Sequence, residues 1–241
     1  MNKTGPRPRM LLQLPTLKQE SRPTVADQVF DILQQRILTL ELPPRFRLSE
    51  TEVAKQMGVS RQPVREAFKR LARLGFLEIR PQSGTMVSLI SKDSVVRAQF
   101  IRAALEVQTI HVACKVLGEP DLKALGQIIQ DQKQAVIRND PDSFHALDDQ
   151  FHREICQRSG VGFVWELITE HKPHMDRIRV LSLSNESQKV ALDEHMVIFD
   201  ALAARDDDAA SEAMIVHLSK ILVLAEQTKA KHRDWFMDPV A

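Results

Sequence analysis

Apolar residues recur at helical spacing between Gly58 and Gly75, and polar residues fill the positions between them. The apolar positions are Val64, Phe68, Leu71, Ala72 and Leu74. Ser60 precedes this stretch as an N-cap, and Pro63 falls in the first turn, where helices accept proline. The opposite face carries Arg61, Gln62, Arg65, Lys69, Arg70 and Arg73. The pattern predicts an amphipathic helix with a basic outer face.

Two further helices are predicted upstream of this basic helix. The first covers residues 24–38 and ends before the prolines of residues 42–44, which cannot continue a helix. Ser49 and Glu52 have the spacing of a capping box and open the second helix, which Gly58 can end in the left-handed conformation. Two helices joined by a short turn, the second of them basic, are typical of a helix–turn–helix.

The pattern changes to period two after Gly75. Residues 76–80 and 85–90 alternate between apolar and polar side chains, and Pro81-Gln82-Ser83-Gly84 between them has the composition of a hairpin turn. A two-stranded hairpin beside a helix–turn–helix is a wing. Residues 24–90 are therefore predicted to form a winged helix–turn–helix domain.

From Ser91 onward the apolar positions follow helical spacing throughout. Six helices are expected, over residues 93–116, from Leu122 onward, and over 141–159, 162–182, 186–204 and 207–230. Residues 91–230 are thus predicted to form an all-helical bundle. The fold class is mostly α. Residues 1–23 are expected to be a flexible arm, and the tail 231–241 has no evident role.

Composition limits the partners of this chain of 241 residues. Residues 1–90 contain 15 basic and 8 acidic side chains, whereas residues 91–241 contain 18 and 24. This asymmetry suggests a half that binds a polyanion, with nucleic acid as the first candidate. No apolar run is long enough for a membrane span and no signal peptide is evident, so we expect no membrane partner and a cytoplasmic protein. Cys114 and Cys156 do not make a disulfide framework.

Residues 24–90 resemble the winged helix–turn–helix of the GntR family of bacterial transcription regulators. The resemblance rests on Leu48-Ser49-Glu50, on the run from Gly58 to Ala67, and on Leu71, Gly75 and Gly84. It implies that Arg61, Arg65 and the residue between them contact operator DNA together with the wing tip, and we add Ser60 and Gly84 to this set. The family usually has threonine where this chain has Gln62, whose longer amide suits an adenine edge.

Four side chains in the helical half have the spacing of a metal site. Asp148 and His152 lie four residues apart on one predicted helix, and His195 and His217 lie on two others. Three imidazoles and a carboxylate pointing into a bundle can bind a divalent transition metal with open coordination positions. From spacing alone, histidines that satisfy core or helix-end hydrogen bonds remain the first interpretation.

The helical half also resembles the effector domain of the FadR-type branch of the GntR family, known as the FCD domain. The resemblance lies in Asp148-Asp149-Gln150-Phe151-His152, in Glu194-His195-Met196-Val197-Ile198 and in Met214 with His217-Leu218. It implies that Asp148, His152, His195 and His217 hold one divalent metal, with zinc first and nickel or manganese as alternatives. It also places Arg102 at the effector pocket. Arg179 is a second candidate for effector binding.

These observations favour a ligand-responsive DNA-binding regulator over an enzyme. Its partners would be double-stranded operator DNA, a small organic or sugar acid and a second copy of the chain, and repression is the expected mode. Two alternatives remain at this point: a metal-dependent hydrolase fused to a DNA-binding module, and a structural DNA-binding protein whose metal is structural.

Overall fold

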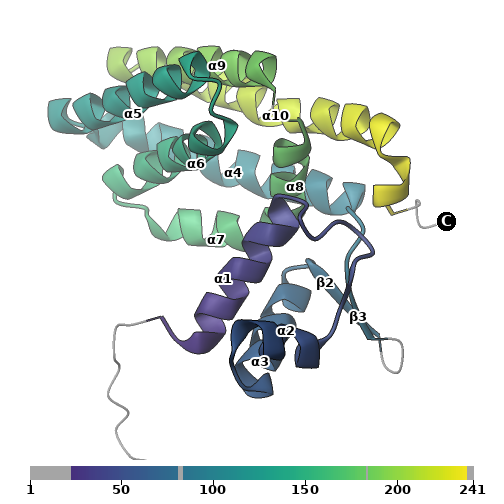
Figure 1. The fold of residues 1–241 in the computed structure, drawn as a ribbon. Coiled ribbons are helices and arrows are strands. Elements are labelled where there is room, and N and C mark those ends of the chain that lie inside the picture. The colour runs from purple at the N-terminus through teal and green to yellow at the C-terminus, as the bar shows by residue number, and fades with distance from the viewer. Residues whose placement is uncertain (1–22, 81–83, 183, 238–241) are drawn as a thin grey trace, which may run out of the picture.

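The computed structural model describes residues 23–80, 84–182 and 184–237, which form two units that meet at residues 88–91 (Figure 1). The first unit contains helices α1 (Val25–Leu38), α2 (Glu50–Met57) and α3 (Arg61–Arg73), and strands β1 (Arg47–Leu48), β2 (Leu77–Arg80) and β3 (Gly84–Val87). One core joins the helices to the sheet and includes Val29, Ile37, Phe68, Leu71 and Val87. The winged helix–turn–helix is therefore confirmed.

The sheet has one more strand than the sequence pattern indicates. Strands β2 and β3 pair antiparallel, with Leu77 opposite Val87 and Arg80 opposite Gly84. Strand β1 joins the other edge of β3, so the strand order is β1-β3-β2. Strand β1 has only two residues, too few to display a period-two pattern.

The caps of the first three helices differ from one another. The Thr24–Asp27 capping box of α1 forms, with Asp27 N donating to Thr24 Oγ1 at 3.1 Å. Ser49 and Ser60 occupy N-cap positions, but neither side chain makes a capping bond. The predicted Ser49–Glu52 capping box is thus wrong. Glu52 instead accepts a hydrogen bond from Gln56.

A proline explains the missing cap at the start of α3. Ser60 is the N-cap residue, so Pro63 is the third residue of the helix. An N-cap hydroxyl normally accepts a hydrogen bond from the N–H group of the second or third helical residue. Pro63 has no N–H group to give, which leaves Gln62 as the one possible donor of the two. Gln62 N does not bond to the hydroxyl of Ser60, an exposed residue, so this hydroxyl is not used in capping.

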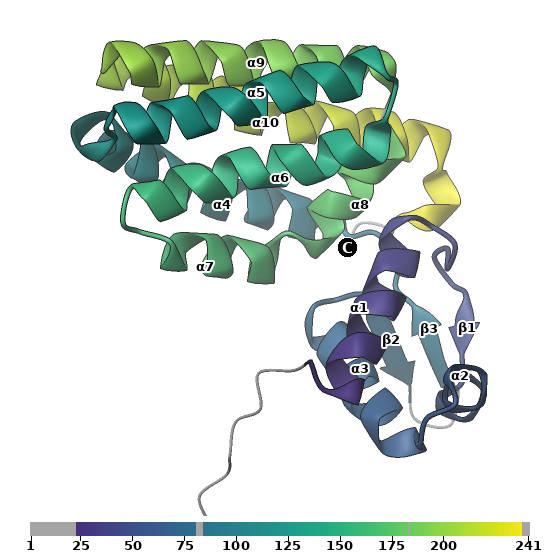
Figure 2. The ribbon, with the colours of Figure 1, turned by 60° about the vertical axis from the view of Figure 1, so that its left-hand side comes forward.

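The second unit is a bundle built on long helices that run side by side (Figure 2). Its helices are α4 (Lys92–Val116), α5 (Glu119–Ile137), α6 (Pro141–Arg158), α7 (Phe163–His171), α8 (Pro173–Ser182), α9 (Asn185–Ala204) and α10 (Asp207–Lys231). Their main core includes Ile110, Leu125, Phe151, Ile198 and Leu202. The all-helical bundle is confirmed.

One helix of the predicted six is two helices in the structure. The stretch 162–182 is interrupted between His171 and Pro173, so that α7 and α8 are separate. Pro173 lacks the N–H group that would continue α7, and its ring disfavours a helical conformation at Lys172. This break turns α8 toward the first unit (Figure 2).

The residues after α10 pack against the segment between the two units. A short 3-10 helix, Arg233–Trp235, brings Phe236 into a core with Ile90. Ile90 N donates to Trp235 O at 2.8 Å, and Met237 N donates to Ile90 O at 2.9 Å. Residues 231–237, to which the sequence assigned no role, therefore hold the inter-unit segment in place.

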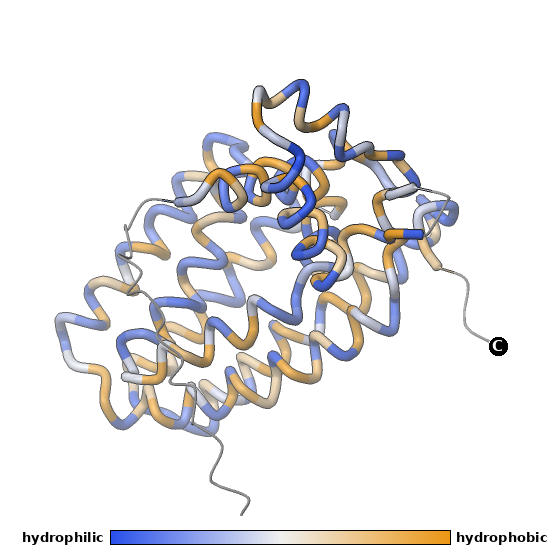
Figure 3. Tube along the Cα trace, turned by 90° about the horizontal axis from the view of Figure 1, so that it is seen from below, coloured by the Kyte–Doolittle hydropathy of each residue, from blue (hydrophilic) through white to orange (hydrophobic). Residues whose placement is uncertain are grey.

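The long helices carry apolar and polar residues mixed along their whole length (Figure 3). Among the described residues, no helix is both long enough and apolar enough to cross a membrane. The predicted arm at residues 1–23 lies outside the described residues except for Pro23.

Candidate functional site

Helix α3 presents the predicted DNA-contacting side chains to solvent. Its buried face is Val64, Ala67, Phe68 and Leu71. Gly58 ends α2 with φ +65°, a left-handed conformation that glycine adopts without strain and that allows the short turn into α3. Arg61, Gln62 and Arg65 fall on the exposed face, next to the exposed Ser60.

Glu50 lies between the two arginines at the start of α3. Its Oε2 is 3.5 Å from Arg61 Nη2 and 3.2 Å from Arg65 Nε. Both arginine side chains are about half exposed, at 59% and 47%. Exposed ion pairs of this kind contribute only ~0–1 kcal/mol. The guanidinium groups can therefore exchange Glu50 for phosphate or base oxygens at little cost.

The wing contributes Gly84 at the start of β3, exposed and with φ +89°. A Cβ atom there would have open space around it, so it is the backbone conformation that favours glycine. The other predicted tip residues, Gln82 and Ser83, lie outside the described residues. The described part of the wing also carries Arg47 and Arg80, both exposed.

The four predicted metal ligands come together inside the bundle. Asp148 and His152 come from α6, His195 from α9 and His217 from α10. The Nε2 atom of His217 lies 3.2 Å from that of His152 and 3.3 Å from that of His195. His195 Nε2 is 3.6 Å from Asp148 Oδ1. All four candidate ligand atoms lie within 4.8 Å of one another.

These distances fit a single bound metal ion. Two nitrogen ligands at ~2.0–2.1 Å from one zinc ion are roughly 3–3.4 Å apart, and the two Nε2–Nε2 distances fall in this range. Burial lowers the pKa of His217 to about 4 and lowers that of His195 well below its ordinary value. Both imidazoles are therefore neutral near pH 7, which is the state that binds metals.

Each histidine of the cluster has a polar partner at its other ring nitrogen. Glu106 Oε2 lies 2.5 Å from His152 Nδ1, Gln132 Oε1 lies 3.0 Å from His195 Nδ1, and Glu194 Oε2 lies 2.9 Å from His217 Nδ1. Partners of this kind fix the tautomer and ring orientation of metal-binding histidines. The three Nδ1 contacts leave the three Nε2 atoms facing one another.

Glu106 also pairs with Arg102, one turn earlier on α4. Arg102 Nε lies 2.5 Å from Glu106 Oε1, and both side chains are almost fully buried. Burial would raise the pKa of Glu106, but the charges of Arg102 and His152 lower it below the usual range. Burial also opposes the charge of Arg102, while Glu106 holds the pKa of Arg102 above its ordinary value. The pair therefore lies in the core of the helical bundle.

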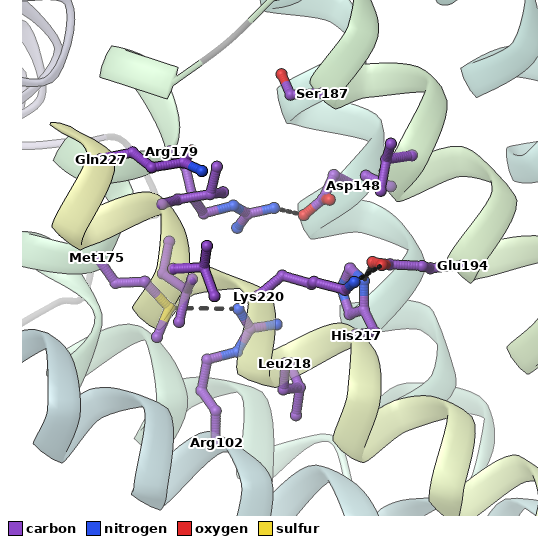
Figure 4. Close-up of a pocket in the computed structure, with 15 residues that line it drawn as sticks. Arg102, Asp148, Met175, Arg179, Ser187, Glu194, His217, Leu218, Lys220 and Gln227 are labelled. Carbon is purple, nitrogen blue, oxygen red and sulfur yellow. Dashed lines mark hydrogen bonds and ion pairs between the residues drawn. The ribbon is translucent and has the colours of Figure 1, made fainter.

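A cavity of about 230 Å³ opens onto this cluster (Figure 4). Asp148 and His217 line it, as do Arg102 from α4 and Arg179 from α8. Among the described residues, Arg102 Nη2 has no hydrogen-bond partner. Arg179 is already paired, with Asp148 and with Asp149 Oδ1 at 2.9 Å. Both predicted effector-binding arginines are therefore at the cavity, and Arg102 has a buried, unused donor there.

A second acidic group beside the cavity is an ion-pair network. His145, Asp149 and Asp176 could hold a metal by their spacing. Lys172 Nζ, however, lies 2.6 Å from Asp149 Oδ2 and 2.8 Å from Asp176 Oδ1. The buried ammonium group supplies the positive charge that a metal would bring. We therefore assign these side chains a structural role.

Helix α8 connects the cavity to the segment between the units. Met175 and Arg179 line the cavity. On the other side of α8, Arg177 is fully buried, and Arg177 Nη1 donates to Ser88 O at 2.9 Å. His174 Nδ1 accepts from Ser91 N at 3.2 Å. A Cβ atom on Gly75, just after α3, would come within 2.9 Å of His174 Nε2, so only glycine fits there.

Each of the two units matches a known protein family. Residues 25–87 match the model of bacterial regulatory proteins of the gntR family, and residues 99–220 match the FCD domain. The chain belongs to the GntR family. It is 37% identical to the HTH-type transcriptional repressor RspR of Escherichia coli K12, over 92% of this chain and 99% of RspR.

Other relatives and structures agree with the GntR assignment. The chain is 31% identical to a probable D-xylose utilization operon repressor of Paenarthrobacter nicotinovorans, over 86% of this chain and 91% of that one. Its fold matches E. coli McbR/YncC with a TM-score of 0.72 at 23% identity, over 85% and 98% of the two chains. A GntR regulator from Rhodococcus sp. RHA1 matches with a TM-score of 0.68 at 21% identity, over 85% and 97%.

The GntR assignment settles the class of function. The chain is a DNA-binding transcription regulator, since its family and its relatives are regulators and not enzymes. The sequence did not identify Glu106, Gln132 or Glu194 as partners of the metal-binding candidates. The available signal was the four-residue spacing of Arg102 and Glu106, which places the two side chains on one face of α4.

Proposed function

We propose that this regulator is a repressor that binds operator DNA through α3 and releases it when a small organic acid or sugar acid binds beside a metal in the helical domain. The observation that carries the proposal is the convergence of three Nε2 atoms and a carboxylate at the wall of a cavity that also contains Arg102. A purely structural metal would not need this cavity.

Operator DNA is read by the exposed end of α3. Arg61 and Arg65 bind guanine edges or phosphates, and Gln62 reads a base edge, with adenine as its natural partner. The unused hydroxyl of Ser60 and the backbone at Gly84 contact the DNA backbone. The exposure of all five residues supports this role. Because it acts on operator DNA, we place the protein in the cytoplasm.

A homodimer is the proposed DNA-binding form. One short recognition helix reads only a few base pairs, so specific operators usually contain two half-sites for a symmetric pair. Sedimentation of the free protein should therefore give twice the mass of one chain, 27.4 kDa. A protein that is monomeric both free and on DNA would refute the dimer.

The metal site consists of Asp148, His152, His195 and His217. Zinc is the first candidate, with nickel and manganese as alternatives, because imidazole and carboxylate ligands accept all three. A metal bound there supplies positive charge and open coordination positions for a carboxylate oxygen. Glu106, Gln132 and Glu194 hold the imidazole rings for it.

Arg102 completes the binding site for the acid. Its Nη2 lacks a partner among the described residues, and its side chain is only 5% exposed. A buried guanidinium nitrogen without a partner gains a charge-assisted hydrogen bond when a carboxylate enters the cavity. Arg179, held by Asp148 and Asp149, borders the same cavity and positions Asp148.

Helix α8 carries the signal to the DNA-binding domain. Met175 and Ile221 line the cavity and belong to the same core as Ile90 in the inter-unit segment. A ligand that moves α8 also moves Arg177 and the segment it holds at Ser88. The ligand must favour one arrangement over the other, and a coupling of roughly 1–3 kcal/mol is sufficient for a switch.

Two variants test the proposal. His195→Ala should lower the metal content and the response to acid, while operator binding without acid persists. Arg177→Met should keep metal and acid binding but lose the effect of acid on operator affinity. Arg97→Met, a change to an exposed arginine on α4 near the same junction, is the control. Metal retained in wild type with no response to any acid would instead support a structural metal.

A further inference from the structure

We infer that the acid bound in the cavity has an apolar body, such as a short aliphatic monocarboxylate, and is not a polyhydroxylated sugar acid. This inference rests on the proposed function and names the chemical class of the ligand. Apolar side chains make up about half of the residues that line the cavity. Its apolar lining consists of Met175, Val190, Ala191, Leu218, Ile221, Val223 and Leu224.

Charged side chains of the cavity can fix the anionic end of the ligand. Arg102, Asp148, Arg179 and His217 all line the cavity (Figure 4). Arg102 Nη2 is buried without a hydrogen-bond partner among the described residues. A carboxylate placed at this nitrogen leaves the rest of the ligand against the other lining residues, most of which are apolar side chains of α9 and α10.

The remaining polar side chains of the cavity are already engaged. Ser187 Oγ lies 2.9 Å from the carbonyl oxygens of Ser182 and Ser184, either of which can accept its proton, and accepts from Ser184 N at 2.8 Å. Glu194 accepts from His217. Within the described part of the chain, this leaves two exposed polar lining side chains: Gln227, which makes no side-chain hydrogen bond, and Lys220, whose Nζ lies 3.6 Å from Glu194 Oε1.

Hydroxyl groups that lie against the apolar part of the wall would therefore lose water without gaining partners. Burying a hydroxyl without a hydrogen bond is unfavourable, and a sugar acid brings several of them. Each methylene group buried against the apolar wall instead strengthens binding about fourfold. The volume of about 230 Å³ is just below the ~300–1,000 Å³ usual for drug-sized ligands, so the cavity suits a short acid.

Hexanoate and gluconate provide a matched test, because both are six-carbon monocarboxylates and only gluconate carries hydroxyl groups on its chain. Their affinities for the zinc-loaded full chain are measured by calorimetry, with butyrate as a shorter acid. We expect hexanoate to bind at least tenfold more tightly than gluconate, and about 15-fold more tightly than butyrate from its two extra methylene groups.

The variant Val190→Asn tests whether the apolar chain of hexanoate binds in the cavity. Val190 lines the cavity and is 46% exposed, so the fold tolerates the change. The variant should weaken hexanoate binding at least fivefold and leave gluconate binding within twofold. Val197→Asn is the control, since Val197 lies on the same helix, is 58% exposed and is not part of the cavity wall.

The outcomes separate this inference from the proposed function. Gluconate binding as tightly as hexanoate would overturn the inference and leave acid sensing intact. Equal losses in Val190→Asn and Val197→Asn would also overturn it, because the apolar body would then lie elsewhere. If neither acid binds and neither changes operator affinity, both the inference and acid sensing by this cavity fail.

Discussion

Two carboxylates in this protein each lie between two basic side chains, one in each domain. Glu50 pairs with Arg61 and Arg65 beside the recognition helix, where its side chain is 26% exposed. Glu106 pairs with Arg102 and His152 inside the helical bundle, where its side chain is 3% exposed. Each carboxylate thus has an arginine partner, but the surroundings differ.

This difference in solvent exposure decides how easily each carboxylate can give up its basic partners. Around Glu50 water screens the ion pairs, so the arginines can leave the carboxylate for DNA at little cost. Around Glu106 each group depends on the other, because an unpaired charge in the core is strongly unfavourable. The exposed site is thus suited to reversible DNA contacts, and the buried site to holding a metal and an anion in fixed positions.

The largest difference between the two sites should appear in stability. Glu106→Gln leaves the buried Arg102 without its counter-charge and should lower the free energy of unfolding by about 3–5 kcal/mol. The matched change Glu50→Gln should cost less than about 1 kcal/mol. Urea unfolding of both variants and the wild type, in the presence of a chelator, measures the loss in the free energy of unfolding. Equal losses would show that burial does not distinguish the two carboxylates.

Operator affinity should depend on the exposed arginines. Arg65→Ala removes one base or phosphate contact and should cost about 1–3 kcal/mol of binding. Arg36→Ala, which removes an exposed arginine near the end of α1 that pairs with Glu41, is the control. Fluorescence anisotropy at fixed salt measures the operator affinity of both variants. An Arg65→Ala protein that is folded and binds the operator like wild type would remove this residue from the DNA site.

Metal affinity should depend on the buried partners of the histidines. Glu194→Gln weakens the contact at His217 Nδ1 and should reduce zinc affinity about 10–100-fold. Competition with a chromogenic chelator gives the affinity. Glu212→Gln, at an exposed position on α10, should leave it unchanged. If the two variants bind zinc alike, Glu194 does not orient His217 for a metal.

The smallest effect is a pH dependence at the junction of the domains. Burial and Arg177 lower the pKa of His174 to about 4, below the value of ~6.5 in an unfolded chain. The unfolded state therefore binds the proton first as the pH falls from 6.5 toward 4, and stability is lost in this range.

His174→Gln should remove this part of the pH dependence. At pH 5.5, the wild type should have lost about 1 kcal/mol more than the variant, relative to pH 7.5. Thermal unfolding of both proteins across this range is the measurement. Parallel pH profiles would mean that His174 is not held neutral by its surroundings.

The DNA-binding domain could be predicted from sequence because its signals are local. The caps and turn glycines, the basic face of α3 and the period-two stretches each lie within a few residues of one another. The errors there have local causes too: β1 is too short to show a period, and Pro63 removes one of the two N–H groups that the Ser60 hydroxyl could have capped.

The helical domain was predictable only in part, because its site is assembled across six helices, α4, α5, α6, α8, α9 and α10. Periodicity placed the helices, and the family resemblance selected Asp148, His152, His195 and His217. Neither indicated that Glu106 and Gln132, far away in sequence, contact those histidines. Such contacts depend on how helices pack, which the spacing within one helix does not specify. Pro173 was visible in the sequence, but its effect on the orientation of α8 was not.

The central claim is that acid binding at the metal-containing cavity weakens operator binding. The most direct measurement is an anisotropy titration of the protein–operator complex with hexanoate and, separately, with gluconate. Each titration is done on zinc-loaded protein and on chelator-treated protein, with the operator obtained by selection from random DNA. We expect acid to release the operator only from zinc-loaded protein, and we expect His195→Ala to behave like chelator-treated wild type. A full response to acid in metal-free protein would contradict it.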